Sequence, residues 1–237
     1  MDDAHGPANV DAISSLGDAN RRALYDFVVE HGDWTSRDQA AKATGIERAT
    51  AAHHLDRLAS DGLLETDYRR LTGRTGPGAG RPAKVYMRAR RDIAVSLPPR
   101  DYELAGRMLA AAADRARRHG TEIQDAIDTE ARHVGRRLGE EIAELLRGSR
   151  RARTGAAVQL AIDRLAVHGY EPERDDRGII VLRNCPFHTL AQEHTDLICG
   201  MNLCLLTEAL GHLDAVGLQA RLEPEEGQCC VKLHPSA

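Results

Sequence analysis

The sequence predicts a mainly helical fold with smaller α+β parts, and three observations support this fold class. The chain has 237 residues, which is longer than one typical domain. Apolar residues make up 42% of it but aromatic residues only 3%, so the core must consist mainly of Leu, Ala, Ile and Val, which favours closely packed helices. The hydrophobic period also changes along the chain, and we place domains at residues 10–97, 98–150 and 151–237.

The first domain is expected to contain helices separated by short turns. Asp18 is a suitable N-cap for its main helix. Thr35 or Ser36 can then cap a short helix, and Gly45 supplies the turn that follows it. A further helix is expected to begin at Ile46, and this order is that of a helix-turn-helix.

The second helix of this pair has two distinct faces. Ala51, Leu55 and Leu58 recur at intervals of three and four residues and form one apolar stripe. The opposite face carries hydrogen-bonding side chains, which a helix needs in order to read base edges in a major groove. An ordinary solvated helix face is the alternative interpretation. The side chains expected to face DNA from this helix are Arg48, Thr50, His53, His54 and Arg57.

A basic hairpin is expected directly after this helix. Residues 63–66 and 84–88 have the pattern of strands, and residues 68–82 that of an arginine-bearing, glycine-rich loop between them. The net charge of −4 alone argues against a nucleic-acid binder, but residues 69–100 contain nine Lys or Arg residues and a single acid, Asp92. This pattern predicts a winged helix-turn-helix whose wing contacts DNA phosphates. The wing residues expected to do so are Arg74, Arg81 and Lys84.

The motifs of this region resemble those of ArsR-like and DeoR-like bacterial regulators. The resemblance covers about residues 10–90 and includes the wing sequence GRPAKVY at residues 80–86. It implies a winged-helix fold that binds double-stranded operator DNA. The residues that match the family signature TxxHHLxxLxxxGLL are Thr50, His53, His54, Leu55, Leu58, Gly62, Leu63 and Leu64.

Two long helices are expected in the middle of the chain. Pro98 and Pro99 close the first domain, because two prolines cannot continue a strand or a helix interior. Residues 101–118 and 121–147 then carry helical apolar stripes. A regulator that reads a two-fold operator needs its recognition helices about 34–36 Å apart, so we expect these helices to form a homodimer. The alternative is that they pack only within the chain.

The last domain is predicted to be a small α+β domain with an antiparallel sheet. A helix at residues 156–168 is followed by strands at residues 170–173 and 179–183, joined by a turn-forming cluster. A short helical piece and a long helix at residues 196–216 come next. Two more strands, at residues 219–222 and 229–233, complete the domain.

Five cysteines lie in the last quarter of the chain. Their odd number does not suggest a disulfide framework, and the intervals between the first, second and fourth of them are too wide for a zinc finger or ribbon. Thiolates from three separate elements suit an iron–sulfur cluster. The alternative is that the cysteines serve only as small buried apolar residues. Alternation along the last strand favours Cys229 as the inward residue of its pair. The cysteines are Cys185, Cys199, Cys204, Cys229 and Cys230.

Three segments around these cysteines are similar to the C-terminal domain of SufR-like regulators. They are NCPFH at residues 184–188, CGMN at residues 199–202 and GQCCV at residues 227–231. The resemblance implies an iron–sulfur cluster, 4Fe–4S rather than 2Fe–2S, and repression of cluster-assembly genes. The chain departs from evenly spaced members because it has no thiol near Asp214, so Cys230, Cys204 and His188 all remain candidates for the fourth ligand. The metal ligands assigned on this basis are Cys185, Cys199, Cys229 and Cys230.

The sequence therefore predicts a homodimeric DNA-binding repressor that senses iron–sulfur status. The alternatives are a cluster-free thiol redox sensor, a sensor of a metal or small effector, and a thiol enzyme using a cysteine with His188 or His194. An enzyme is not expected, because catalysis would need a substrate pocket that the sequence does not reveal. No Walker or Rossmann motif occurs. No run of 18 apolar residues occurs either, so we expect a soluble, cytoplasmic protein without a membrane partner.

Overall fold

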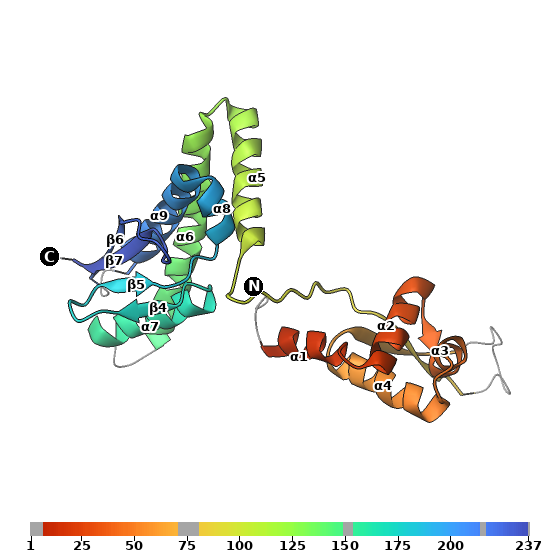
Figure 1. Cartoon of the computed structure of the whole chain (residues 1–237). Helices are drawn as coiled ribbons and strands as arrows, with labels where there is room; N and C mark the ends of the chain where they lie inside the picture. The colour runs from red at the N-terminus through yellow and green to blue at the C-terminus, as the bar shows by residue number, and fades with distance from the viewer. Residues whose placement is uncertain (1–6, 71–80, 149–153, 214–216, 237) are drawn as a thin grey trace. The chain divides into compact units, whose positions relative to one another are not determined.

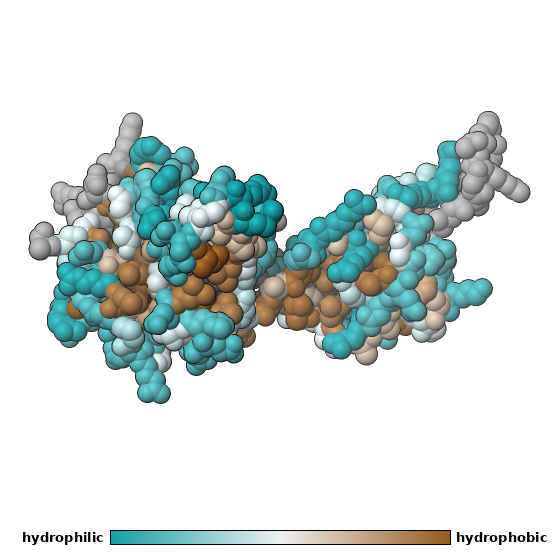
Figure 2. Space-filling model, turned by 90° about the horizontal axis from the view of Figure 1, so that it is seen from above, coloured by the Kyte–Doolittle hydropathy of each residue, from teal (hydrophilic) through white to brown (hydrophobic). Residues whose placement is uncertain are grey.

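The computed structural model describes residues 7–70, 81–148, 154–213 and 217–236, and it has a mixed α+β fold. The chain divides into two compact units, Met1–Val95 and Ser96–Ala237 (Figure 1). On the face seen in Figure 2, both units show hydrophobic patches among predominantly hydrophilic side chains. Within the described residues, no helix is long and apolar enough to cross a membrane.

The first unit combines four helices with a three-stranded sheet in its described part. The strands pair antiparallel in the order β1-β3-β2, and Thr66 of β2 lies opposite Tyr86 of β3. The described elements are α1 (Pro7–Ser15), α2 (Ala19–His31), β1 (Thr35–Ser36), α3 (Arg37–Thr44), α4 (Arg48–Ser60), β2 (Leu64–Arg69) and β3 (Ala83–Arg88).

The helix starts of this unit follow from local hydrogen bonds. Asp18 caps α2 by accepting a bond from the backbone N–H of Arg21 at 2.9 Å, as predicted. Of the two candidates for the α3 cap, Ser36 is the cap, and it forms a reciprocal capping box with Gln39. Helix α4 begins two residues later than expected, because the Glu47 carboxylate accepts bonds from the first N–H groups of the helix and ends the turn.

The core of the first unit contains the predicted stripe of α4. Ala51, Leu55 and Leu58 are completely buried, and they pack with Leu24 of α2 and Tyr86 of β3. Burial of these side chains fixes the rotation of α4 about its axis. Its opposite face is consequently exposed.

The second unit places a four-stranded antiparallel sheet beside a group of helices, as Figure 1 shows. The strand order is β4-β5-β7-β6, so the predicted antiparallel α+β arrangement is confirmed. The last strand begins two residues later than expected. The elements are α5 (Tyr102–His119), α6 (Ile123–Gly148), α7 (Thr154–Val167), β4 (Pro172–Arg174), β5 (Ile180–Leu182), α8 (His188–Glu193), α9 (Thr195–Gly211), β6 (Leu218–Leu222) and β7 (Val231–Pro235).

Helices α6 and α9 approach each other closely at two glycines. A Cβ atom on Gly139 would lie 2.7 Å from the carbonyl oxygen of Ala209, and one on Gly135 would lie still closer to that of Leu205. No larger residue fits at either position. The buried residues of α5, α6, α7, α9 and the sheet form one core, so the two helices expected as a separate arm pack within the second unit.

Candidate functional site

All five cysteines belong to the second unit, and four of them lie close together. Cys185 follows β5, Cys199 lies in the second turn of α9, and Cys229 and Cys230 directly precede β7. The side chains of Cys185, Cys199 and Cys229 are buried, and that of Cys230 is partly exposed. The three predicted segments therefore converge on one place in the fold.

The four cysteines form two adjacent pairs. Cys199 and Cys230 are joined as a disulfide, with their Cα atoms 6.1 Å apart. The thiols of Cys185 and Cys229 are hydrogen-bonded to each other. The disulfide occupies two of the four sulfurs. The part of the chain that the structure describes contains no group of three His, Cys, Asp or Glu side chains that could hold a metal ion.

The expectation that Cys230 points away from the other cysteines was wrong. It assumed that the alternation of β7 extends to residues 229 and 230, but the strand begins at Val231. In the bend before the strand, Cys230 reaches Cys199, while Cys229 faces the core with 1% of its surface exposed. The inward orientation predicted for Cys229 is confirmed.

The two free thiols of the site have different acidities. The thiol of Cys229 donates to the sulfur of Cys185 and so holds the pKa of Cys185 below its usual value, helped by the N–H of Phe187 and the charge of Arg100. The same hydrogen bond, together with burial, raises the pKa of Cys229. Cys185 therefore loses its proton first, and its thiolate is the better nucleophile and metal ligand of the two.

A buried polar chain lies behind Cys229. The Asn202 amide donates to the Cys229 sulfur at 3.3 Å, and the Tyr170 hydroxyl donates to the Asn202 carbonyl oxygen at 2.6 Å. Burial raises the pKa of Tyr170, so its hydroxyl remains a donor. The sequence analysis missed both residues. The available signal was Asn202 itself, a polar residue one helical turn after Cys199 in an apolar helix.

A second polar group flanks Cys185. Asn184, which is 5% exposed, donates to the backbone oxygens of Pro99 at 2.8 Å and Gly169 at 2.6 Å. Arg100 donates to the side-chain oxygen of Asn184 and to the backbone oxygen of Cys185, the latter at 3.1 Å. The sequence analysis missed this group as well, because its partners lie more than eighty residues apart.

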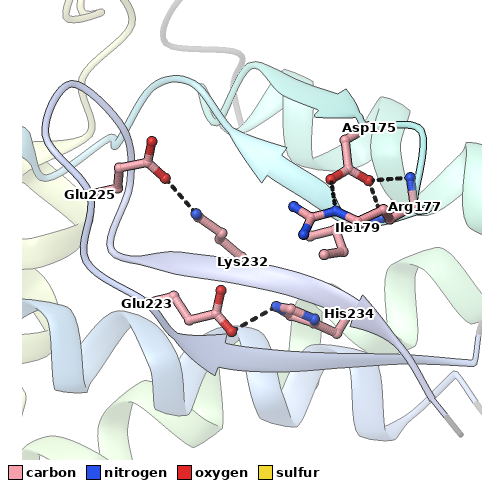
Figure 3. A network of polar contacts seen from close by, with 7 residues as sticks. All are labelled: Asp175, Arg177, Ile179, Glu223, Glu225, Lys232 and His234. Carbon is pink, nitrogen blue, oxygen red and sulfur yellow. Dashed lines mark hydrogen bonds and ion pairs between the residues drawn. The ribbon is translucent and has the colours of Figure 1, made fainter.

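The hairpin that carries Cys229 and Cys230 is held by close side-chain contacts to carboxylates, which Figure 3 shows. Lys232 lies 2.6 Å from the Glu225 carboxylate, and His234 lies 2.9 Å from that of Glu223. The N–H of Glu223 also donates to the backbone oxygen of Cys230 at 2.7 Å. Nearby, the Asp175 carboxylate accepts bonds that close the β4–β5 turn (Figure 3). These contacts fix the backbone on either side of the cysteine pair.

Of the three candidates for a fourth ligand, the structure brings Cys230 to the site. Cys204 is half-buried farther along α9, where burial raises its pKa. His188 begins α8, and its backbone N–H donates to the carbonyl oxygen of Cys185. Four thiols, three of them buried, are a donor set of the kind that holds iron–sulfur clusters once the disulfide is reduced.

The residues expected to face DNA lie in the first unit. His53 is exposed on α4, with the ring of His54 5.6 Å away, and the Thr50 hydroxyl lies 3.4 Å from the Glu47 carboxylate. Arg81 is exposed just before β3. Arg74 lies outside the described residues.

Three of the expected DNA-binding cations are paired with carboxylates. Arg48 contacts Asp38, Arg57 lies 2.9 Å from Asp61, and Lys84 lies 2.7 Å from Asp56. The Tyr86 hydroxyl also donates to Asp56, at 2.8 Å. Pairs at exposed positions contribute only about 0–1 kcal/mol each, so a phosphate can replace the carboxylates at low cost.

Comparison of the chain with known protein families, curated proteins and solved structures found no match. The resemblance to ArsR-like, DeoR-like and SufR-like regulators therefore stays a prediction from the motifs.

Proposed function

We propose that the chain is a DNA-binding transcriptional repressor that senses iron–sulfur status and controls cluster-assembly genes. The observation that supports this function best is the convergence of Cys185, Cys199, Cys229 and Cys230 from three distant segments. Structural thiols have no need to converge in this way, whereas metal ligands do. In this proposal the protein is not an enzyme and acts in the cytoplasm.

In this proposal the first unit is a winged helix-turn-helix. Helices α3 and α4 form the helix-turn-helix around Gly45, whose φ of 71° needs glycine, and strands β2 and β3 form the wing. The exposed face of α4 supports a role in reading base edges, and Arg81 and Lys84 support phosphate contacts.

The proposed homodimer forms through the outer surfaces of α5 and α6. Both helices bury their inner sides within the second unit. Large apolar side chains nevertheless remain exposed at their ends, namely Tyr102 (41%), Ile123 (47%) and Leu145 (45%). Such side chains are suited to an interface between two copies, which a two-fold operator requires.

The ligands of the proposed 4Fe–4S cluster are Cys185, Cys199, Cys229 and Cys230. Two electrons and two protons must first convert the Cys199–Cys230 disulfide to two thiols. The bound cluster supplies iron–thiolate bonds that oxidation breaks. The chain contributes a buried site, a hydrogen bond from Asn202 to one sulfur, and the positive charge of Arg100 beside Cys185.

Anaerobic purification tests the cluster directly. We expect visible absorption together with equal amounts of iron and acid-labile sulfide. Serine substitution of Cys185, Cys199, Cys229 or Cys230 should remove or destabilise the cluster. Cys204→Ser is the matched control and should preserve it, because Cys204 is a free thiol whose electrostatic neighbours are Asp128 and Arg132. A wild-type protein without iron would contradict the proposal.

DNA binding is tested by selection from a pool of random duplexes with the full chain. Enrichment of a two-fold symmetric sequence is expected, and its affinity should differ between the cluster-loaded and cluster-free protein. If neither the cluster-loaded nor the cluster-free protein enriched any sequence, the chain would not be a sequence-specific regulator.

A thiol redox sensor without a cluster is the second candidate, and the Cys199–Cys230 disulfide favours it. Here hydrogen peroxide oxidises the two thiols to the disulfide and is itself reduced to water. The two candidates differ in one measurement. If the second candidate is right, the purified protein contains no iron. Its affinity for the selected duplex then changes with the oxidation of Cys199 and Cys230 alone.

A further inference from the structure

We propose that Asn184 and Arg100 form a latch that ties the loop of Cys185 to residues 96–101, the segment that follows the first unit in the sequence. Movement of the Cys185 sulfur then changes how firmly this segment is held. The inference rests on the proposed function, because it describes how the cysteine site would signal to the DNA-binding unit. The term latch refers to these two side chains and their hydrogen bonds.

Asn184 provides the buried half of the latch. Its amide donates to Pro99 and Gly169, and its side-chain oxygen accepts a bond from Arg100. Because Asn184 is only 5% exposed, little water can replace a partner that moves away. Displacing Asn184 therefore breaks contacts to residues on both sides of the Pro99–Arg100 bond.

Arg100 provides the other half. One terminal nitrogen of its guanidinium contacts both the side chain of Asn184 and the backbone oxygen of Cys185. The neighbouring Asp101 donates its backbone N–H to the carbonyl oxygen of Pro186 at 3.0 Å. The segment is thus bonded to the residues immediately before and after Cys185, and to Cys185 itself.

The same segment sets the start of α5. The Asp101 carboxylate caps this helix by accepting a bond from the N–H of Leu104 at 2.8 Å. Pro99 also packs against Gly169, where a Cβ atom would lie 3.0 Å from the Pro99 side chain. There is consequently little room for the segment to shift while the latch is closed.

Cys185 is the ligand most able to transmit movement. Cys229 is bonded through its backbone N–H to Leu182 of β5 and through its sulfur to Asn202. Its partner Cys185 lies in the loop after β5, and the two sulfurs are in hydrogen-bond contact. A cluster held by both sulfurs would replace their mutual contact with bonds to iron, and the loop of Cys185, which is less tied than Cys229, would be the side that moves. Loading the site therefore opens the latch.

Trypsin cleavage of the full-length protein tests this coupling. Cleavage between Arg100 and Asp101 should be compared, by mass spectrometry of the same digest, with cleavage between the exposed Arg91 and Asp92. We expect the ratio to rise at least threefold when reduced, cluster-free protein is reconstituted anaerobically with iron and sulfide. Exchange of the Asp101 amide should accelerate in parallel. An equal or lower ratio after loading overturns the coupling.

Two variants identify the latch residues. Asn184→Ala and Arg100→Lys should give rapid cleavage at position 100 in both states, because alanine removes the amide that bonds Pro99 and Gly169, and lysine keeps the charge and the cleavage site but lacks the rigid guanidinium plane that places the donating nitrogen between Asn184 and Cys185. Arg107→Lys is the matched control, since Arg107 pairs with Glu103 on the exposed side of α5, and it should behave as wild type. Wild-type ratios in both latch variants would overturn the assignment.

Failure of the proposed function is distinguished by the iron content of the same samples. A wild-type chain that takes up no iron contradicts the cluster, and with it the coupling. In that case the existence of the latch is tested by the cleavage rates of the cluster-free protein alone. Faster cleavage at Arg100 in Asn184→Ala supports it, and an unchanged rate overturns it.

Discussion

The exposed face of α4 and the cysteine site of the second unit are built in opposite ways. On α4 some contacts are local: Arg57 pairs with Asp61 four residues later, and Glu47 bonds to Thr50 three residues later, whereas Asp56 reaches Lys84 of β3. At the cysteine site, 31 residues separate Cys199 from Cys230, and 32 separate Tyr170 from Asn202. The exposed face is presented by one helix, whereas the cysteine site is assembled from several distant segments of the folded unit.

This difference determines how each site responds to substitution. Exposed side chains exchange their partners for water at little cost, so changes on α4 should alter binding without altering the fold. Buried polar groups have no such substitute, so changes near the cysteines should lower stability and cluster retention together. The following predictions test this contrast in order of decreasing effect.

The largest effect is expected at the contact between α6 and α9. Gly135→Ala should lower the free energy of unfolding of the second unit by about 3 kcal/mol, because the new methyl group would meet the backbone of Leu205. Gly106→Ala on α5, where nothing lies within 4 Å, should stabilise the same unit by about 0.5–1 kcal/mol.

Urea unfolding followed by circular dichroism measures both glycine variants. The fluorescence of Trp34, the sole tryptophan, reports on the first unit and should be unchanged in each. A parallel shift of the fluorescence transition would show that the two units unfold together, which would break the contrast drawn above.

The next effect concerns the polar chain behind Cys229. Asn202→Ala should cost about 2 kcal/mol, because it leaves the Tyr170 hydroxyl buried without its acceptor. Tyr170→Phe, which removes the hydroxyl itself, should cost about 1 kcal/mol. In the cluster-loaded protein, Asn202→Ala should also bleach faster in air. Equal losses of stability in the two variants would contradict the role given to the unpaired hydroxyl.

Effects on DNA binding are expected to leave the free energy of unfolding unchanged. His53→Ala should change the preference among selected duplexes by about 1–3 kcal/mol if this residue reads a base. Arg81→Ala should instead weaken binding to all sequences and reduce the salt dependence by roughly one phosphate contact. Fluorescence anisotropy at several salt concentrations separates the two. If Arg81→Ala instead lost affinity for only some sequences, Arg81 would read bases and the role given to it here would be wrong.

The smallest effect is expected from the ion pair of Asp56. Burial opposes ionisation of this half-exposed carboxyl, but hydrogen bonds from Lys84 and Tyr86 outweigh it and lower its pKa. A lowered pKa adds stability above the ordinary carboxyl pKa, and this contribution is lost as the pH falls below about 4. After allowance for screening it amounts to about 0.5 kcal/mol.

Asp56→Asn tests this pair in two ways. Above about pH 4 the first unit of the variant should be slightly less stable than that of the wild type, and the two should converge as the pH falls below about 4, as measured by Trp34 fluorescence between pH 3 and 6. The freed Lys84 should also bind DNA of any sequence more tightly. Unchanged affinity would show that Lys84 does not reach the phosphates.

The parts of the structure that sequence reasoning predicted well are those set by local rules. The stripe of Ala51, Leu55 and Leu58 follows from helical periodicity, and the caps Asp18 and Ser36 follow from the need to satisfy free N–H groups. The start of α4 was misplaced because an acidic cap, Glu47, was not considered.

The cysteine site was predictable in membership but not in arrangement. The spacing indicated which thiols would converge, yet the contact of Cys230 with Cys199 depends on where β7 begins, because strand alternation does not govern Cys230 in the bend before Val231. Asn202, Tyr170 and Arg100 could not be paired with their partners, because their contacts depend on the packing of α9 and the sheet rather than on neighbouring residues.

The distance along the chain between the two halves of the latch has a consequence during synthesis. Arg100 leaves the ribosome 84 residues before Asn184. At about 5–20 residues per second this delay is roughly 4–17 s, which is long compared with the folding of a small helical unit. The first unit can therefore fold first, and the contacts between Arg100 and Asn184 form only after the second unit has been synthesised up to and beyond Asn184.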